Sequence, residues 1–257
     1  MTLSTIRNNP AKQKKVKTKK QKAIAATCAV AFWLLVWHVV SLCVGSELVL
    51  VSPVKVVQTL FTVIFDPDFL KTVWYSAARI LGGFFTALTL GTVLGWVASR
   101  FWVVETLLRP ITAAIKATPV ASFIILVLLW FSGKNLSVII SMLMVFPVIY
   151  MNVLEGIRSA DEKLLEMAQV FRLSVGKKLL YIYLPAVAPF FVSACSVSLG
   201  LCWKSGIAAE VIGTPDGSIG AVFYQAKIFL QTSELLAWTV VVVAVSVAFE
   251  KLDRKSV

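Results

Sequence analysis

Charged residues are scarce in this chain of 257 residues, of which 15% are Asp, Glu, Lys or Arg and 58% are hydrophobic. A soluble domain carries about 25% charged residues and about 45–50% apolar ones. The composition therefore excludes an ordinary soluble protein and favours one embedded in a membrane. The length suits a single helical bundle and leaves no room for a second, catalytic domain.

Several chemical signatures are also missing. The chain contains no G-x-x-x-x-G-K-[ST] phosphate loop, so it does not itself bind ATP in that manner. Its single histidine and four cysteines show no metal-site spacing, and no constellation of nucleophile and base is visible. We therefore expect neither an enzyme nor a metal site.

Acidic residues are absent from residues 1–22, which hold eight Lys or Arg residues. Such a stretch resists translocation and stays in the cytoplasm, where it is suited to attract anionic membrane lipid. No aromatic residues interleave with the lysines, which argues against a nucleic-acid partner. We therefore expect a basic cytoplasmic tail over residues 1–22.

Long apolar runs predict an all-α integral membrane protein with about six transmembrane helices, since about 20 apolar residues in a helix cross about 30 Å of hydrocarbon. The predicted spans are residues 23–45, 77–99, 118–132, 136–155, 185–204 and 235–250. Residues 46–70 are predicted to form an outer interfacial segment with a helix that starts at Pro53. Residues 205–234 are expected to form an outer loop with a re-entrant or interfacial piece.

Lys and Arg are unevenly distributed between the two sides of this arrangement. Of the 25 such residues, 19 fall in the two tails and the loops on the same side, and five fall on the opposite side. Because cytoplasmic loops carry the excess of Lys and Arg, both termini are predicted to be cytoplasmic, including residues 251–257.

Asp and Glu are missing from the interiors of the predicted spans, and Glu210 is assigned to the outer loop. Carriers coupled to protons or sodium usually place ionisable groups on their pathway. No inverted repeat is visible either. These absences argue against a secondary transporter.

A polar, amphipathic segment separates the fourth and fifth predicted spans. Ser159 followed by Glu162 is a capping-box pattern, which predicts the start of a short helix. Residues 173–176 interrupt this helix, a second helix is expected near Lys177, and Pro185 is expected to make a corner at the membrane surface. Such a helix either docks on a partner protein or floats on the inner leaflet.

The same segment matches a known pattern. Glu166, Ala168, Ile182, Leu184 and Pro185 are in register with E-A-A, three residues, Gly, nine residues, then I-x-L-P. The segment therefore resembles the EAA loop of ABC importer permeases, the type-1 inner-membrane components of binding-protein-dependent transport systems. Arg172 stands at the pattern's Gly position, and Gly176 is expected to shift the turn. The runs at residues 79–84 (RILGGF), 130–133 (WFSG) and 208–213 (AAEVIG) resemble the nitrate/sulfonate/taurine-type branch.

This resemblance implies a type I ABC importer permease fold over residues 71–250, with a cytoplasmic coupling helix in the loop 156–184. It implies transport of a small solute, such as a nitrate-, sulfonate- or taurine-like or related organic anion, across the bacterial cytoplasmic membrane by alternating access. The implied partners are two copies of an ATP-binding subunit, a second permease copy in a homodimer, and an extracytoplasmic solute-binding protein. No cofactor is expected on the chain itself. The alternatives are an autonomous secondary transporter or channel, and a non-transporting membrane scaffold.

Small residues recur every fourth position in the second predicted span, at Gly83, Ala87, Gly91 and Gly95. Such stripes let helices approach closely. The stripe serves either packing within one bundle or contact with a second copy.

Three residues are candidates for the substrate pathway. Ser193 and Ser196 make the fifth predicted span the least apolar, although small polar residues also join helices to one another. Arg79 is placed near the outer end of its span, where it either reaches the interface or contacts an anionic substrate.

Overall fold

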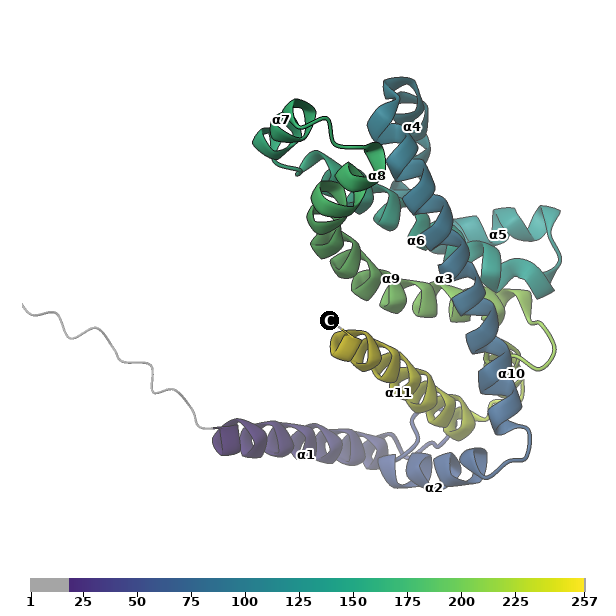
Figure 1. The fold of residues 1–257 in the computed structure, drawn as a ribbon. Helices are drawn as coiled ribbons and strands as arrows, with labels where there is room; N and C mark the ends of the chain where they lie inside the picture. The colour runs from purple at the N-terminus through teal and green to yellow at the C-terminus, as the bar shows by residue number, and fades with distance from the viewer. Residues whose placement is uncertain (1–18, 257) are drawn as a thin grey trace, which may run out of the picture. The chain divides into compact units, whose positions relative to one another are not determined.

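The structure is a computed structural model that describes residues 19–256, and the regular elements of this range are helices (Figure 1). The basic tail predicted for residues 1–22 lies largely outside the described residues. The chain divides into two units, Met1–Lys55 and Val56–Val257. The first unit contains α1 (Lys19–Val44), whose described side chains are mostly exposed, as suits a helix surrounded by lipid.

The second unit contains four helical segments that are long and apolar enough to cross a membrane. They are α3 (Phe69–Arg100), α6 (Gly133–Arg158), the continuous segment Val175–Gly213, and the part Thr232–Phe249 of α11 (Thr232–Ser256). With α1 the described residues contain five candidate spans, or up to six if one bent pair of helices counts as a span. The prediction of an all-helical membrane protein with about six spans is confirmed.

The bent pair replaces the predicted span 118–132. It consists of α4 (Trp102–Ala117) and α5 (Val120–Trp130), and the chain bends by 111° between the two helices. With 11 residues α5 is only about 16 Å long, roughly half of the hydrocarbon thickness. The break falls at Thr118, whose extended backbone is the conformation that the following Pro119 favours.

Two helices extend further than the apolar runs predict. α3 begins at Phe69 rather than at residue 77, directly after a turn in which the Asp68 amide donates to Asp66. α9 (Leu184–Gly213) continues nine residues past its predicted end, so the prediction of a loop at 205–213 is wrong. Gly206 does not interrupt this helix because it packs directly against Ile80 and Ser141. The rest of the predicted outer loop contains α10 (Ile219–Ile228).

The core of the second unit is built around α6. Of the most apolar stretch of α6, 56% is buried, against 33% of the corresponding stretch of α3. α6 is therefore the central helix. Its residues Val145, Ile149 and Val153 form one cluster with Ile80 of α3 and Trp203 of α9. A helix in the predicted interfacial segment is also present: α2 (Pro53–Ile64) starts at Pro53, as expected, and its 12 residues are too few to span a membrane.

The small-residue stripe of α3 lies against α6. A Cβ atom added at Gly83 would lie 2.4 Å from the Val138 carbonyl oxygen, and one added at Gly91 would lie 2.9 Å from Ile149 Cγ2. Gly95 is in similar contact with Val153, and Ala87 is fully buried. Because α6 of the same chain covers the stripe, these four residues are not available for contact with a second copy.

Replacing Gly83 by Ala is therefore expected to destabilise the bundle by about 1–3 kcal/mol, because the new methyl group would overlap a backbone carbonyl that cannot rotate away. The matched control is Gly82→Ala, since nothing lies within 4 Å of a Cβ at this neighbouring position. The measurement is the thermal unfolding midpoint of the purified protein in detergent. Equal midpoints for the two variants would contradict close packing of α3 on α6.

Candidate functional site

The polar segment between α6 and α9 forms two short helices. α7 (Glu162–Val170) follows the end of α6 after three residues, and α8 (Val175–Lys178) follows a short turn. The cap of α7 is Asp161, whose carboxylate accepts a hydrogen bond of 2.9 Å from the Lys163 amide. The predicted capping box at Ser159 is wrong, because the Ser159 hydroxyl donates to the Gly156 carbonyl at the end of α6.

The turn after α7 is made by Arg172, which has a φ of +49°. The Leu173 amide donates to the Ala168 carbonyl at 2.9 Å, and the Arg172 amide donates to the Gln169 carbonyl at 3.0 Å. This is the Schellman arrangement, in which a left-handed residue, most often glycine, ends a helix. The expectation that Gly176 shifts the turn is therefore wrong: Gly176 lies in α8, and Arg172 adopts the backbone conformation typical of the pattern's Gly.

Two residues of the EAA pattern anchor the segment. Ala168 is fully buried and Ile182 is 7% exposed, and together with Ala160 they form a small cluster on which Leu165 and Leu173 pack. The contact of Leu173 with this cluster completes the turn at Arg172. Glu166 and Leu184, in contrast, are exposed. The pattern thus combines residues that hold the segment with residues that face outward.

A continuous helix leads from this segment into α9. α8 is followed without a break by η1 (Leu179–Tyr183), a π-helical turn, and then by α9. The Leu184 amide donates to the Leu179 carbonyl, so the wider turn ends just before Pro185. The predicted corner at Pro185 is wrong, because the wider turn lets the helix pass through the proline.

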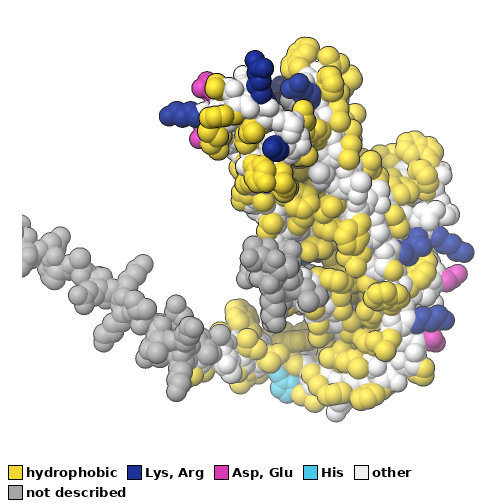
Figure 2. All heavy atoms as spheres, in the orientation of Figure 1, with side chains coloured by type: hydrophobic (Ala, Val, Ile, Leu, Met, Phe, Trp, Pro, Cys, Tyr) yellow, Lys and Arg dark blue, Asp and Glu magenta, His cyan; other side chains and the backbone are white. Residues whose placement is uncertain are grey.

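The outward face of α7 carries large apolar side chains. Leu164 is 43% exposed, Met167 46% and Val170 79%, and Phe171 and Val175 beyond the helix are also exposed. Figure 2 shows hydrophobic side chains at this end of the molecule, interspersed with Lys, Arg, Asp and Glu. A contiguous apolar row with a charged rim is typical of a protein docking surface.

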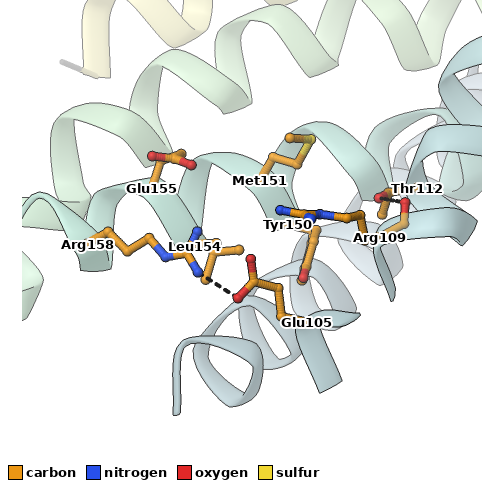
Figure 3. A pocket seen from close by; sticks show the side chains of 8 residues that line it. All are labelled: Glu105, Arg109, Thr112, Tyr150, Met151, Leu154, Glu155 and Arg158. Atoms are coloured by element: carbon orange, nitrogen blue, oxygen red, sulfur yellow. Dashed lines mark hydrogen bonds and ion pairs between the residues drawn. The ribbon is translucent and has the colours of Figure 1, made fainter. Parts of the chain in front are cut away.

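Two cavities lie where this segment joins the bundle. A cavity of about 410 Å³ is bounded by the ends of α3 and α6 and by α7, α8 and η1. A smaller one of about 110 Å³ lies between α4 and α6 (Figure 3), where Arg158 and Glu105 form an ion pair of 2.6 Å. The Ala168–Ile182 cluster therefore holds the segment between these cavities, and the ion pair joins α4 to the end of α6, just before the segment begins.

The three candidate pathway residues lie apart from this segment. Ser193 is exposed on α9, and the Ser196 hydroxyl donates to the Val192 carbonyl of its own helix. Arg79 lies ten residues into α3, and its guanidinium carbon lies 5.2 Å from the centroid of the Tyr75 ring. It also donates to side chains of α6, Ser137 and Asn135, at 3.4 Å each.

One buried carboxylate was not predicted from the sequence. Glu210 is fully buried in α9, and its Oε2 accepts a hydrogen bond of 2.6 Å from the Ser76 hydroxyl of α3 and one of 3.4 Å from the Gly220 amide. The Ser76 hydroxyl in turn accepts from the Ile219 amide at 2.9 Å. Glu210 and Ser76 thus hold the first turn of α10, whose amides have no partner within the helix.

The assignment of Glu210 to an outer loop is therefore wrong, and so is the premise that no acid lies inside the apolar helices. The available signal was its position after Gly206, Ala208 and Ala209. Small residues at this spacing indicate a close-packed helix that continues, rather than a loop.

Replacing Arg172 by Gly is expected to stabilise the turn after α7 by up to about 1 kcal/mol, because a left-handed backbone costs an L-residue about 1–2 kcal/mol and glycine loses about 0.5–1 kcal/mol in flexibility. Hydrogen exchange at the amides of residues 172 and 173 should become slower. The control is Gly176→Ala, where a Cβ meets nothing within 4 Å and these amides should be unaffected. Faster exchange in the Arg172→Gly variant would contradict the assigned turn.

Replacing Glu210 by Ala is expected to cost about 1–3 kcal/mol, since the Ser76 hydroxyl and the Gly220 amide lose a buried acceptor. Glu210→Gln keeps an oxygen acceptor and should cost less. The measurements are the unfolding midpoint and the rate of proteolysis within α10. Asp216→Ala, which removes a nearby exposed acid, is the control. If the Gln and Ala variants are equally destabilised, the hydrogen bonds do not carry the effect.

Comparison with known proteins assigns the chain to a class. Residues 87–249 match the model of the family described as binding-protein-dependent transport system inner membrane component, and they make up more than half of the chain. The chain belongs to this family. It is a permease subunit of an ABC importer and a multi-pass protein of the cytoplasmic membrane.

Its relatives belong to the branch that the sequence motifs indicate. TauC of Escherichia coli, a taurine transport system permease protein, is 27% identical over 220 residues, which cover 83% of this chain and 80% of TauC. SsuC of Bacillus subtilis, named as an aliphatic sulfonates transport permease, is 29% identical over 211 residues, 81% of this chain and 76% of SsuC. NrtB of Synechocystis, a nitrate import permease protein, is 25% identical over 214 residues, 79% of this chain and 76% of NrtB.

A solved structure has the same fold. A chain of the MetNI methionine ABC transporter in an inward-facing conformation superposes with a TM-score of 0.53 at 16% identity, covering 74% of this chain and 96% of that chain. The predicted family, its nitrate/sulfonate/taurine-type branch and the type I permease fold are confirmed. The alternatives of an autonomous secondary transporter or channel and of a scaffold fall away.

Proposed function

We propose that α7 is the coupling helix of this importer and that it docks on a separate ATP-binding subunit. The observation that carries the proposal is the exposed apolar row of Leu164, Met167 and Val170 on a helix whose other exposed residues are polar. Buried Ala168 and Ile182 hold the other face of the segment, so a displacement of α7 is passed on to α6 and to the helix that leads into α9. Closure of the ATPase would move these helices.

ATP is bound by the partner in this proposal, and the permease supplies no cofactor. The absence of a phosphate loop from the whole sequence supports this division of labour. Two ATP-binding subunits would act on two permease copies, with the second copy identical to the first. The glycine stripe of α3 is occupied by α6, so the contact between copies would use other surfaces.

Both termini face the cytoplasm in this proposal. If α4 and α5 together cross the membrane once, the six crossings place both ends of the chain on the same side. The excess of Lys and Arg on that side then makes it the cytoplasmic side. The same arrangement places α7, which lies between the fourth and fifth crossings, on the ATPase side.

The transported solute would be a small oxyanion, a sulfonate or a related organic anion, delivered by an extracytoplasmic binding protein. The printed functions of the relatives, taurine, aliphatic sulfonate and nitrate transport, support this class. Within the chain, Arg79, Ser193 and Ser196 remain the candidate pathway residues. Arg79 is the one cation among them, and its contacts with Tyr75 and α6 would hold it in place for an anion.

Replacing Met167 by Glu tests the docking surface, because it puts a charge into the centre of the exposed apolar row. Co-purification of the ATP-binding subunit with the permease should fall roughly tenfold, which corresponds to about 1.4 kcal/mol. ATP-dependent uptake of labelled sulfonates, taurine or nitrate into vesicles with the reconstituted complex should fall with it. The control is Gln169→Glu, an exposed polar position two residues away in the same helix. Equal recovery of the ATPase with both variants would refute docking through this row.

A further inference from the structure

α4 turns its polar side toward α6. Glu105, Arg109, Thr112 and Lys116 recur every three or four residues along α4 and form one stripe. Figure 3 shows three of them, Glu105, Arg109 and Thr112, around the cavity beside α6, and the Lys116 ammonium lies 3.2 Å from Met151 Sδ. The opposite side of α4 is apolar and exposed, with Val103 at 59%, Leu107 at 64% and Ile111 at 52%.

The ion pair between Glu105 and Arg158 is the closest polar contact in this seam. The Arg158 guanidinium donates to Glu105 Oε2 at 2.6 Å, and the two side chains are 48% and 17% exposed. An apolar patch lies beneath it, where Val104 and Leu108 of α4 pack on Tyr150 and Leu154 of α6. Arg109 extends toward Tyr150 and Met151 in Figure 3 and makes no ion pair with any described residue.

The position of this pair in the chain links two segments of the fold. Arg158 is the last residue of α6, and the cap of α7 follows three residues later. Glu105 lies in the first turn of α4, whose far end bends by 111° into α5. α5 packs on α6 and α9 through Ile124 and Val127. The pair thus connects the root of the coupling segment to the broken helix.

We propose that the Glu105–Arg158 ion pair is a positioning contact that carries the displacement of α7 into α4 and thereby into α5. This inference rests on the proposed coupling role of α7. When the end of α6 moves with α7, Arg158 pulls Glu105 with it, and α4 pivots about its bend with α5. Without the pair, α4 keeps only the small apolar patch on α6 and follows the motion poorly.

The pair is better suited to this task than to holding the fold. Arg158 is half exposed, so water solvates its guanidinium when the pair separates, and an ion pair with an exposed partner contributes modestly to folding stability. Removing the pair should therefore leave the complex assembled, while α4 loses its polar contact with the end of α6. The readout that separates coupling from folding is the amount of solute imported per ATP hydrolysed.

The test uses the full complex of permease, ATPase and binding protein in vesicles. Glu105→Gln and Arg158→Gln should each lower the solute imported per ATP by roughly threefold or more, while ATP hydrolysis continues. The double variant should be no worse than either single one, because both changes break the same contact. The exchange of charges, E105R together with R158E, should restore the ratio. Arg109→Gln, one turn further along α4, is the matched control and should leave the ratio unchanged.

Three results would overturn the inference: single variants with an unchanged ratio, an Arg109→Gln variant that is equally impaired, or a charge exchange that restores nothing. Recovery of the ATPase and the unfolding midpoint are measured for each variant, so a failure to assemble is seen directly. If the unaltered complex imports no solute with ATP, the proposed function itself fails. If it does import solute and the variants couple normally, only the role of this ion pair fails.

Discussion

Close contact between α3 and α6 is the constraint on which the rest of the bundle depends. In lipid the hydrophobic effect does not draw helices together, so van der Waals contact between backbones has to do so. Gly83 and Gly91 bring α3 against α6 at distances that a Cβ atom would not allow, and the contact at Gly95 is nearly as close. α6 is thereby fixed at the centre, with Arg79 and Ser137 in contact toward one end and Arg158 at the other.

Two of the shorter helices, α4 and α10, are also tied to the long helices by polar contacts. Glu210 and Ser76 hold the first turn of α10, and Glu105 holds α4 to the end of α6. Both contacts occur where a long helix meets a shorter one. Their burial differs: Glu210 is fully enclosed, whereas Arg158 is half exposed and its partner Glu105 is 17% exposed.

Much of the fold was predictable because its main signals are local in the sequence. Runs of apolar residues gave α1, α3, α6, α9 and α11, and the pattern from Glu166 to Pro185 gave the family and the type I fold. The errors arose where a contact between distant residues decided the outcome. Gly206 was predicted to lie beyond the end of a helix, whereas its contacts with Ile80 and Ser141 keep it within α9. The bent pair α4–α5 was predicted as one short span. The left-handed backbone of Arg172 could not be predicted from the sequence. Its conformational free-energy cost is offset by the Schellman hydrogen bonds and by the packing of Leu173 on the cluster that contains Ala168.

The buried Glu210 also changes how acids in such a bundle are interpreted. A carboxylate inside apolar helices is often taken as a sign of ion coupling, yet in this permease of the ABC importer family the two hydrogen bonds that Glu210 Oε2 accepts have a structural role. Its Oε2 accepts from the Ser76 hydroxyl and from the Gly220 amide, which is what a helix N-terminus offers to an anion. A substituent at Gly220 would overlap the Glu210 backbone, so α10 can approach this carboxylate only because that position is glycine. Glu210 and Gly220 therefore form this contact together, and neither residue alone would predict it from the sequence.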